Sequence, residues 1–175
     1  MGKLGPVTNS SSTLNRYTPV LRHYIAEKCL TFMVQASNDA FISLAGAEDT
    51  NFRKNYYEIN IGSSNRRHID ISRTSVKKNV YHSRTGKLVI SREEARSFWI
   101  SWDTGKIKVG SGLEVDKDMM LEWTDKHPFT VETIGVMTGW GSNGTWTILN
   151  DNVKGMYNRF MVFNVTFNNI LVMAV

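Results

Sequence analysis

Apolar and polar residues alternate along several stretches of this chain. Within residues 30–35, Leu30, Phe32 and Val34 occupy every second position, and the same period recurs in residues 41–44, 57–61, 97–102 and 161–167. Successive side chains of a β-strand point to opposite faces of a sheet, so this period indicates strands with one buried face. Shorter apolar runs predict further strands at Ile69–Ser72, Val76–Tyr81, Lys87–Ile90, Lys106–Val109, Met120–Trp123, Val131–Met137 and Trp146–Leu149.

Turn-forming residues separate these predicted strands. Asp103-Thr104-Gly105 and Arg84-Thr85-Gly86 are each expected to close a short hairpin. Only Ser91 to Ala95 has helical signals, because Ser91 is a suitable N-cap with a glutamate three residues later. Many short strands at spacings of roughly 8 to 12 residues are typical of sandwiches and barrels. We therefore predict an all-β, antiparallel β-sandwich of the jelly-roll, lectin-like type.

Length and composition favour a single domain. The chain has 175 residues, of which 41% are hydrophobic and 21% charged, as expected for one hydrophobic core. Residues 1–15 are small and polar and predict a flexible N-terminal arm, which leaves residues 16–175 for the sandwich. No apolar run reaches the roughly 18 residues of a membrane helix. The polar N-terminus lacks a signal-peptide core, which favours the cytoplasm unless a leader has been removed.

Basic residues gather in the middle of the chain. The net charge is +5, and residues 53–96 contain 11 Lys or Arg against four Asp or Glu. These residues either lie on solvated strand faces or concentrate a positive field on one part of the surface. The lone cysteine, Cys29, excludes an intrachain disulfide and opens an apolar alternating run, so a buried, inert thiol is expected.

The signatures of common enzyme classes are missing from the sequence. The four histidines lie far apart without zinc-site spacing. The segment 105–112 resembles a phosphate loop only superficially. No Gly-x-Ser-x-Gly elbow occurs, and no Gly-x-Gly-x-x-Gly lies between a predicted strand and a predicted helix. Acidic turns at residues 116–118 and 150–152 lack the spacing of a full calcium loop. We predict no catalytic residue, no metal and no cofactor.

The most unusual stretch runs from Thr138 to Trp146 and reads Thr-Gly-Trp-Gly-Ser-Asn-Gly-Thr-Trp. Glycines allow a close approach of backbone to ligand, and the indole of Trp140 is a flat apolar platform on which a sugar ring can stack. Asn143 would then form hydrogen bonds with the hydroxyl groups of the sugar. The alternative is that Trp140 plugs the end of the sandwich and the glycines relieve strain there.

A second polar loop follows the strand that ends near residue 62. Gly62-Ser63-Ser64-Asn65-Arg66-Arg67-His68 can expose backbone N–H groups beside two guanidinium ions. Such a loop suits anionic or polyhydroxyl ligands. A turn whose arginines are merely solvated is the alternative.

Four stretches stand out by their order and spacing: Phe32–Leu44, Tyr57–Gly62, Phe98–Gly110 and Thr138–Trp146. Together they resemble the farnesoic acid O-methyltransferase-like domain of arthropods and other invertebrates, over about two-thirds of the chain. The resemblance implies a jelly-roll module that recurs in multidomain proteins, which suits recognition better than catalysis. The family commonly has Gly-Gly-Trp-Gly after the second stretch, whereas this chain has Gly-Ser-Ser-Asn at residues 62–65 and so lacks one tryptophan.

These observations favour a non-enzymatic, carbohydrate-binding module. The expected ligand-binding residues are Trp140, Asn143, Asn65, Arg66 and Arg67. The expected partner is a carbohydrate or glycoprotein; nucleic acid is not expected, and the apolar C-terminal strand offers an edge for a homo-oligomer. Two alternatives stay open: a methyltransferase of the juvenile-hormone pathway, as the family name implies, and a protein-interaction or self-assembly module that uses residues 53–96. The methyltransferase alternative is disfavoured because the sequence lacks a glycine-rich turn that opens into a helix, the usual binding element for S-adenosylmethionine.

Overall fold

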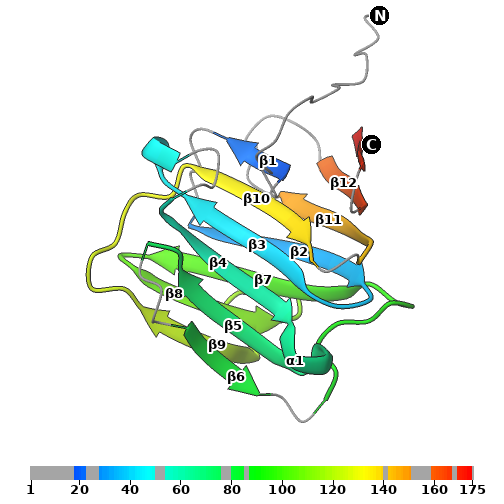
Figure 1. Cartoon of the computed structure of the whole chain (residues 1–175), viewed down its shortest axis with the longest axis horizontal. Helices are drawn as coiled ribbons and strands as arrows, with labels where there is room; N and C mark the ends of the chain where they lie inside the picture. Colours follow the sequence, from blue (N-terminus) through cyan, green and yellow to red (C-terminus); the bar gives the residue numbers. More distant parts are fainter. Residues whose placement is uncertain are drawn as a thin grey trace, which may run out of the picture.

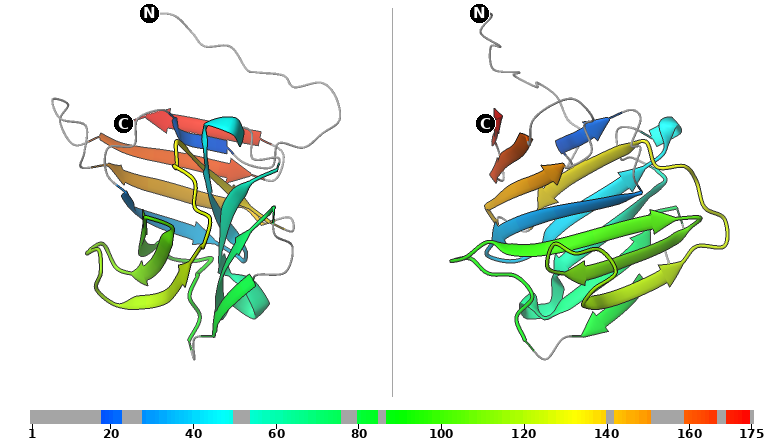
Figure 2. Two further views of the ribbon diagram at one scale, coloured as in Figure 1. Left: turned by 90° about the vertical axis from the view of Figure 1, so that its left-hand side faces the viewer. Right: turned by 180° about the vertical axis from the view of Figure 1, so that it is seen from behind.

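Two antiparallel β-sheets pack face to face, as Figure 1 and the rotated views of Figure 2 show. The computed structural model describes residues 18–22, 28–49, 54–75, 80–84, 87–139, 142–150, 159–166 and 169–174. Within these ranges every strand pairing is antiparallel. The protein is therefore an all-β jelly-roll sandwich, as the alternation predicts. The predicted arm, residues 1–15, lies outside the described residues.

The described residues of the first sheet, sheet A, form six strands in the order β1-β10-β3-β4-β5-β6. Their bounds are Thr18–Arg22 (β1), Thr133–Thr138 (β10), Ala40–Ala45 (β3), Tyr56–Gly62 (β4), His68–Arg73 (β5) and Val80–Arg84 (β6). Residues 80 and 81 of the strand predicted at 76–81 lie in β6, and residues 76–79 lie outside the described part. The short helices α1 (Ser63–Arg66) and η1 (Ala47–Asp49) follow β4 and β3.

In the second sheet, sheet B, the described part of the chain forms seven strands in the order β13-β12-β11-β2-β7-β8-β9. Their bounds are Asn169–Ala174 (β13), Arg159–Thr166 (β12), Gly144–Asn150 (β11), Cys29–Ala36 (β2), Arg96–Asp103 (β7), Lys106–Ser111 (β8) and Met119–Thr124 (β9). The predicted hairpin at residues 103–105 joins β7 to β8. The apolar C-terminal stretch forms β13, which pairs with β12 at the edge of the sheet.

The core lies between the sheets and follows the predicted alternation. Along β2, every second residue is buried and the others are half-buried. Phe32 is fully buried and its ring centroid lies 5.8 Å from that of Phe98 and 5.5 Å from that of Trp146. Burying each large apolar side chain stabilises the fold by about 1.5 to 3 kcal/mol, so these inward positions hold the two sheets together.

The connection between β6 and β7 differs from the sequence prediction. Residues 87–90, predicted as a strand, cross between the sheets without joining either one. Their apolar pattern arises because Val89 and Ile90 are buried against the core, while the Val89 N–H donates to the Arg66 carbonyl at 2.8 Å. Burial alone therefore produced a strand-like pattern. Thr85 and Gly86, the turn of the predicted hairpin, lie outside the described residues.

The predicted helical turn after Ser91 is also absent from the structure. Ser91 Oγ does accept hydrogen bonds from the N–H groups of Glu93 and Glu94, at 3.1 and 3.3 Å. This is the hydrogen bonding of an N-cap. It closes a local turn here because the chain enters β7 two residues later, at Arg96.

Two side chains on the outer face of sheet B differ in burial from what the sequence predicts. Trp99 shares that face with polar neighbours but is fully buried, and its Nε1 donates to the Lys117 carbonyl at 2.7 Å. The segment after β8 therefore covers the indole. Cys29 is half-buried, not buried as predicted, because it occupies an outward position of β2.

Candidate functional site

Three connections meet at one end of the sandwich, which we call the loop end (Figure 1, around and above α1). The register places Ala40, at the start of β3, opposite both Thr138 of β10 and Ile61 of β4. Gly144, at the start of β11, pairs with Ala36 at the end of β2. Residues 37–39, 62–67, 139 and 142–143 therefore emerge side by side. They include four of the residues that the sequence singled out, Asn65, Arg66, Arg67 and Asn143.

Asp39 joins these loops. Its backbone carbonyl accepts a hydrogen bond from the Gly139 N–H at 2.9 Å, and its Oδ1 accepts from Asn60 Nδ2 at 3.1 Å. Asn38 Nδ2 donates to the other carboxylate oxygen at 3.1 Å. Asp39 adopts a φ of 39°, a left-handed conformation that costs free energy in a residue other than glycine. These contacts hold the 139–143 loop beside β4.

The base of the 139–143 loop is fixed by hydroxyl groups. Ser142 Oγ lies 2.8 Å from Ser37 Oγ, and the Ser142 carbonyl accepts from Thr138 Oγ1 at 2.6 Å. The Ser142 N–H donates to the Gly139 carbonyl at 2.9 Å, so the two sides of the loop lie close together. Asn143 is exposed. Trp140 and Gly141 lie outside the described residues.

Packing accounts for two of the glycines that flank Trp140. A Cβ added at Gly139 would lie 2.7 Å from Phe41 Cε2, and one at Gly144 would lie 2.6 Å from Thr138 Cγ2. Both distances are shorter than ordinary contacts between carbon atoms. These two glycines are therefore required for close packing of the chain, whatever a ligand needs.

The second loop is a tight left-handed turn around α1. Ser64, Asn65 and Arg66 have φ values of 46°, 62° and 65°, a left-handed conformation that is unfavourable for serine and arginine and better tolerated by asparagine. The Arg67 N–H donates to the Ser63 carbonyl at 3.1 Å, so it is not presented to a ligand as the sequence suggested. What the turn presents instead are side chains: Asn65 and Arg67 are exposed, and Arg66 is half-buried.

The basic residues of the middle segment do not form one patch. Arg66, Arg67 and Arg92 lie at the loop end, and the Arg92 carbonyl accepts from Gln35 Nε2 near the end of β2. Arg73 lies at the opposite end, because β5 runs away from the loop end. The fold thus divides the predicted positive region between the two ends.

A cavity of about 450 Å³ opens beside the crossing segment. It is lined by Lys87, Leu88, Val89, Arg96, Ser97, Phe98, Ser111 and Met120. Arg96 is engaged within the protein, because it donates to the Leu88 carbonyl and forms an ion pair with Glu94 at 2.9 Å. The cavity can accommodate an apolar group, but the Arg96 guanidinium in its lining is already paired within the protein.

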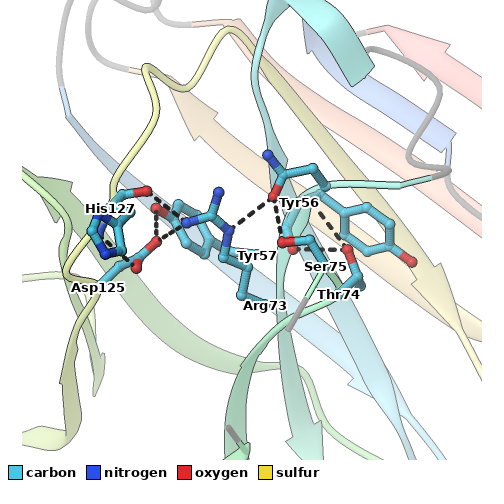
Figure 3. A network of polar contacts seen from close by, with 8 residues as sticks. Tyr56, Tyr57, Arg73, Thr74, Ser75, Asp125 and His127 are labelled. Atoms are coloured by element: carbon cyan, nitrogen blue, oxygen red, sulfur yellow. Dashed lines mark hydrogen bonds and ion pairs between the residues drawn. The ribbon is translucent and has the colours of Figure 1, made fainter. Parts of the chain in front are cut away.

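At the opposite end, a polar network closes the sandwich (Figure 3). Arg73 Nη1 lies 2.6 Å from Asp125 Oδ2, and the side chains are only 13% and 10% exposed. The Tyr57 hydroxyl donates to the same carboxylate oxygen at 2.8 Å. Phe129 stacks on Tyr57 with centroids 4.4 Å apart, and the Arg73 guanidinium lies 5.2 Å from the Phe129 ring centre. These contacts anchor the segment after β9 to sheet A.

The network shifts the pKa values of two groups. Burial raises the pKa of Tyr57 well above its ordinary value, and the carboxylate that accepts its proton reinforces the shift. Burial also opposes the charge of Asp125, but hydrogen bonds from the His127 N–H and the Tyr57 hydroxyl and the charge of Arg73 outweigh it. The pKa of Asp125 is therefore lowered. We interpret the network as structural, since its donors and acceptors are directed at one another.

Sequence reasoning missed Ser37, Asn38, Asp39 and Ser142 as organisers of the loop end. Ser-Asn-Asp between two apolar runs is a turn composition that could have indicated residues 37–39. Their link to residue 139 could not be read from the sequence, because it depends on β10 pairing with β3. Within the described ranges no group of three or more His, Cys, Asp or Glu residues is arranged to hold a metal ion.

The two packed antiparallel sheets are those of a jelly-roll domain. The chain belongs to the farnesoic acid O-methyl transferase family, whose model matches residues 11–152. It is 28% identical over 150 residues to the BTB/POZ domain-containing protein At2g30600 of Arabidopsis thaliana, covering 82% of this chain but only 17% of that protein. The similarity therefore extends to a plant protein, beyond the invertebrates that the sequence suggested.

Solved structures with a similar arrangement include two glucanases. One is a prokaryotic β-1,3-1,4-glucanase (lichenase) from a mouse hindgut metagenome, with a TM-score of 0.45 and 13% identity. The other is the Bacillus licheniformis β-glucanase, with a TM-score of 0.44 and 15% identity. Each comparison covers 71% of this chain and 56% of the enzyme. In the described residues no helix is long and apolar enough to cross a membrane.

The family name implies S-adenosylmethionine, a cofactor usually held by a glycine-rich turn that opens into a helix. The only described glycine that ends a strand and opens into an α-helix is Gly62, before α1. That helix has four residues, two of them with non-helical backbone angles, and a Cβ added at Gly62 would lie 2.5 Å from Ile90. This turn is filled by the protein itself and does not fit a nucleotide cofactor.

Proposed function

We propose that this domain is a non-enzymatic, carbohydrate-binding module whose ligand docks at the loop end. The observation that carries the proposal is the network centred on Asp39. It fixes the loop containing Asn143 beside the turn containing Asn65 and Arg67, and all three side chains are exposed. Polar side chains that converge from rigid neighbouring elements are a common arrangement in ligand sites.

The side chains at the loop end suit hydroxyl groups. The amides of Asn65 and Asn143 each offer two donors and one acceptor oxygen, and Arg66 and Arg67 add guanidinium donors. In the proposal, Trp140 supplies the platform on which a sugar ring stacks. A glycan or the glycan of a glycoprotein is the ligand class that uses all of these groups.

A glycan array probed with the full chain tests the proposal. For the strongest hit, Trp140→Ala, Asn143→Ala and Arg67→Ala should each weaken binding at least fivefold, since a net hydrogen bond contributes about 0.5 to 1.5 kcal/mol. Lys126→Ala is a matched control, because Lys126 is exposed at the opposite end. Full affinity in all three loop variants would remove the loop end as the site.

Calorimetry separates this proposal from methyl transfer. A methyltransferase should bind S-adenosylmethionine with micromolar affinity, whereas the proposed module should show no heat of binding beyond dilution. Saturable binding of that cofactor would overturn the non-enzymatic assignment.

A further inference from the structure

We infer that the cavity beside the crossing segment, residues 87–90, is a second part of the ligand site. The saccharide bound at the loop end carries an apolar group, such as an alkyl chain or an aromatic ring, and this group enters the cavity. The inference rests on the proposed function, because it assumes a saccharide at the loop end. It narrows the ligand class to amphiphilic glycosides.

The cavity lies at the same end of the sandwich as the loop end. Its walls on sheet B come from the start of β7, the end of β8 and the start of β9, through Phe98, Ser111 and Met120. Arg96, also in the lining, lies directly opposite Val34, two residues before β2 ends at the loop end. The cavity therefore opens where these strands meet the loops.

Hydrogen bonds join the cavity wall to the proposed sugar site. The Val89 N–H donates to the Arg66 carbonyl at 2.8 Å, and the Ser91 carbonyl accepts from the Ala36 N–H at 2.9 Å. Val89 lines the cavity, and Arg66 belongs to the turn around α1, beside which the crossing segment runs in Figure 1. A ligand at this turn is therefore next to the cavity.

The cavity is present because the inward face of sheet B ends in a small side chain. Along β8, Ile107 and Val109 face the core, and Ser111 follows in the same alternation. Ser111 lies directly opposite the inward Phe98 and is half-buried. At the other end of the same two strands, the large ring of Trp102 is buried opposite Ile107. The core is thus filled at that end and leaves space at Ser111.

The charged groups of the lining are engaged within the protein. Arg96 donates to the Leu88 carbonyl and forms an ion pair with Glu94 at 2.9 Å. The other cation, Lys87, is exposed and also has a partner. Because both cations are already paired, the cavity offers little attraction to an anionic group.

The remaining lining suits an apolar occupant. Leu88, Val89, Phe98 and Met120 contribute apolar side chains, and serine supplies the only hydroxyl groups. An unsubstituted sugar would bury more hydroxyls there than could find partners, which is unfavourable. The volume of about 450 Å³ falls within the range of small-molecule sites, about 300 to 1,000 Å³. It is about three times the roughly 150 Å³ of an apolar cavity that binds benzene.

The test compares two glycosides of one sugar. The full chain is titrated by calorimetry with the methyl and the octyl glycoside of the strongest hit on the glycan array, below the critical micelle concentration of the octyl compound. Each buried methylene group strengthens binding about fourfold. Burial of about three of the additional groups predicts that the octyl glycoside binds at least thirtyfold more tightly than the methyl glycoside.

Filling the cavity should abolish this preference. In Ser111→Phe, the ratio of the two affinities should fall below three, while the affinity for the methyl glycoside stays within twofold of wild type. Ser101→Phe is the matched control and should keep the full ratio, because Ser101 is half-buried on the outer face of the same sheet, between the inward Ile100 and Trp102.

A second pair of variants tests the cavity without adding bulk. Met120→Gln keeps the size of the side chain but makes the wall polar, and it should reduce the ratio at least fivefold. Met119→Gln is its control, because Met119 is 53% exposed and does not line the cavity. Thermal unfolding of all four variants verifies folding, and Met120→Gln decides the outcome if Ser111→Phe does not fold.

The outcomes separate this inference from the proposed function. If the methyl and octyl glycosides bind with affinities within threefold of each other, the cavity takes no part in binding and the inference is wrong, while the proposed function stands. A preference for the octyl glycoside that survives both Ser111→Phe and Met120→Gln would place the alkyl chain elsewhere and would also overturn the inference. If no glycan on the array binds, both fail.

Discussion

Replacing Asp125 with asparagine removes one charge from the ion pair that closes the sandwich opposite the loop end. The partner, Arg73, is 13% exposed and would be left with an uncompensated charge. Breaking a buried ion pair on one side costs about 3 to 5 kcal/mol. We expect the lower part of this range, because the pair lies at the end of the sheets. For a chain of this size such a loss lowers the Tm by roughly 6 to 20 °C.

The effect of Asp125→Asn should depend on pH, in a direction set by the pKa of the carboxyl group. That pKa is lower in the folded protein than in the unfolded chain. The charged carboxylate therefore stabilises the fold above the unfolded pKa of about 4. This contribution is lost as the pH falls through the lower folded pKa, so wild type and variant should converge in stability toward pH 2.

Urea denaturation at pH 7, 5, 4, 3 and 2 measures this dependence. Asp103→Asn is the matched control, because the carboxylate of Asp103 forms an ion pair with Lys28 in which both side chains are mostly exposed. Such exposed pairs contribute little to stability, because solvent and salt screen their charges. A loss below 1 kcal/mol for Asp125→Asn at pH 7, or a difference that persists undiminished to pH 2, would refute the reasoning.

Three further predictions concern the fold. Because burial raises the pKa of Tyr57, the contribution of the protonated Tyr57 to stability should be lost as the pH rises above about 10. Ultraviolet titration of Tyr57→Phe against wild type should identify Tyr57 as the tyrosine that ionises last. Ionisation of Tyr57 together with the other tyrosines would contradict this. Gly144→Ala should destabilise the protein by about 1 to 3 kcal/mol in urea, because the new methyl group would overlap Thr138; an unchanged midpoint would show that the loop adjusts freely. Trp99→Phe should cost about 1 kcal/mol through the lost hydrogen bond to the Lys117 carbonyl, and a stabilised variant would count against that contact.

The sequence predicted the sheets well where one face of a strand is buried and the other is not. The alternation in residues 30–35 and 57–61 corresponds to β2 and β4. It misled at residues 87–90, since apolar residues are also needed where an irregular segment crosses the core. The burial of Trp99 could not be predicted from the alternation along β7, because the segment that covers its indole follows the next strand, β8.

Neither the Arg73–Asp125 network nor the Asp39 network could be predicted from local sequence patterns. Arg73 and Asp125 are separated by 52 residues, and only the packing of the segment after β9 against sheet A brings them together. Asp39 reads as an ordinary turn residue until the register of β3 with β10 and β4 is known. The site residues Asn65, Arg66, Arg67 and Asn143 were predicted from loop composition, and the fold brings their loops to one end.

The most direct measurement is an amide chemical-shift map of the ¹⁵N-labelled full chain titrated with the strongest hit from the glycan array. We predict that the shifts cluster at residues 37–39, 62–67 and 142–143. Shifts confined to the opposite end, around residues 103–106 and 125–129, would contradict the account.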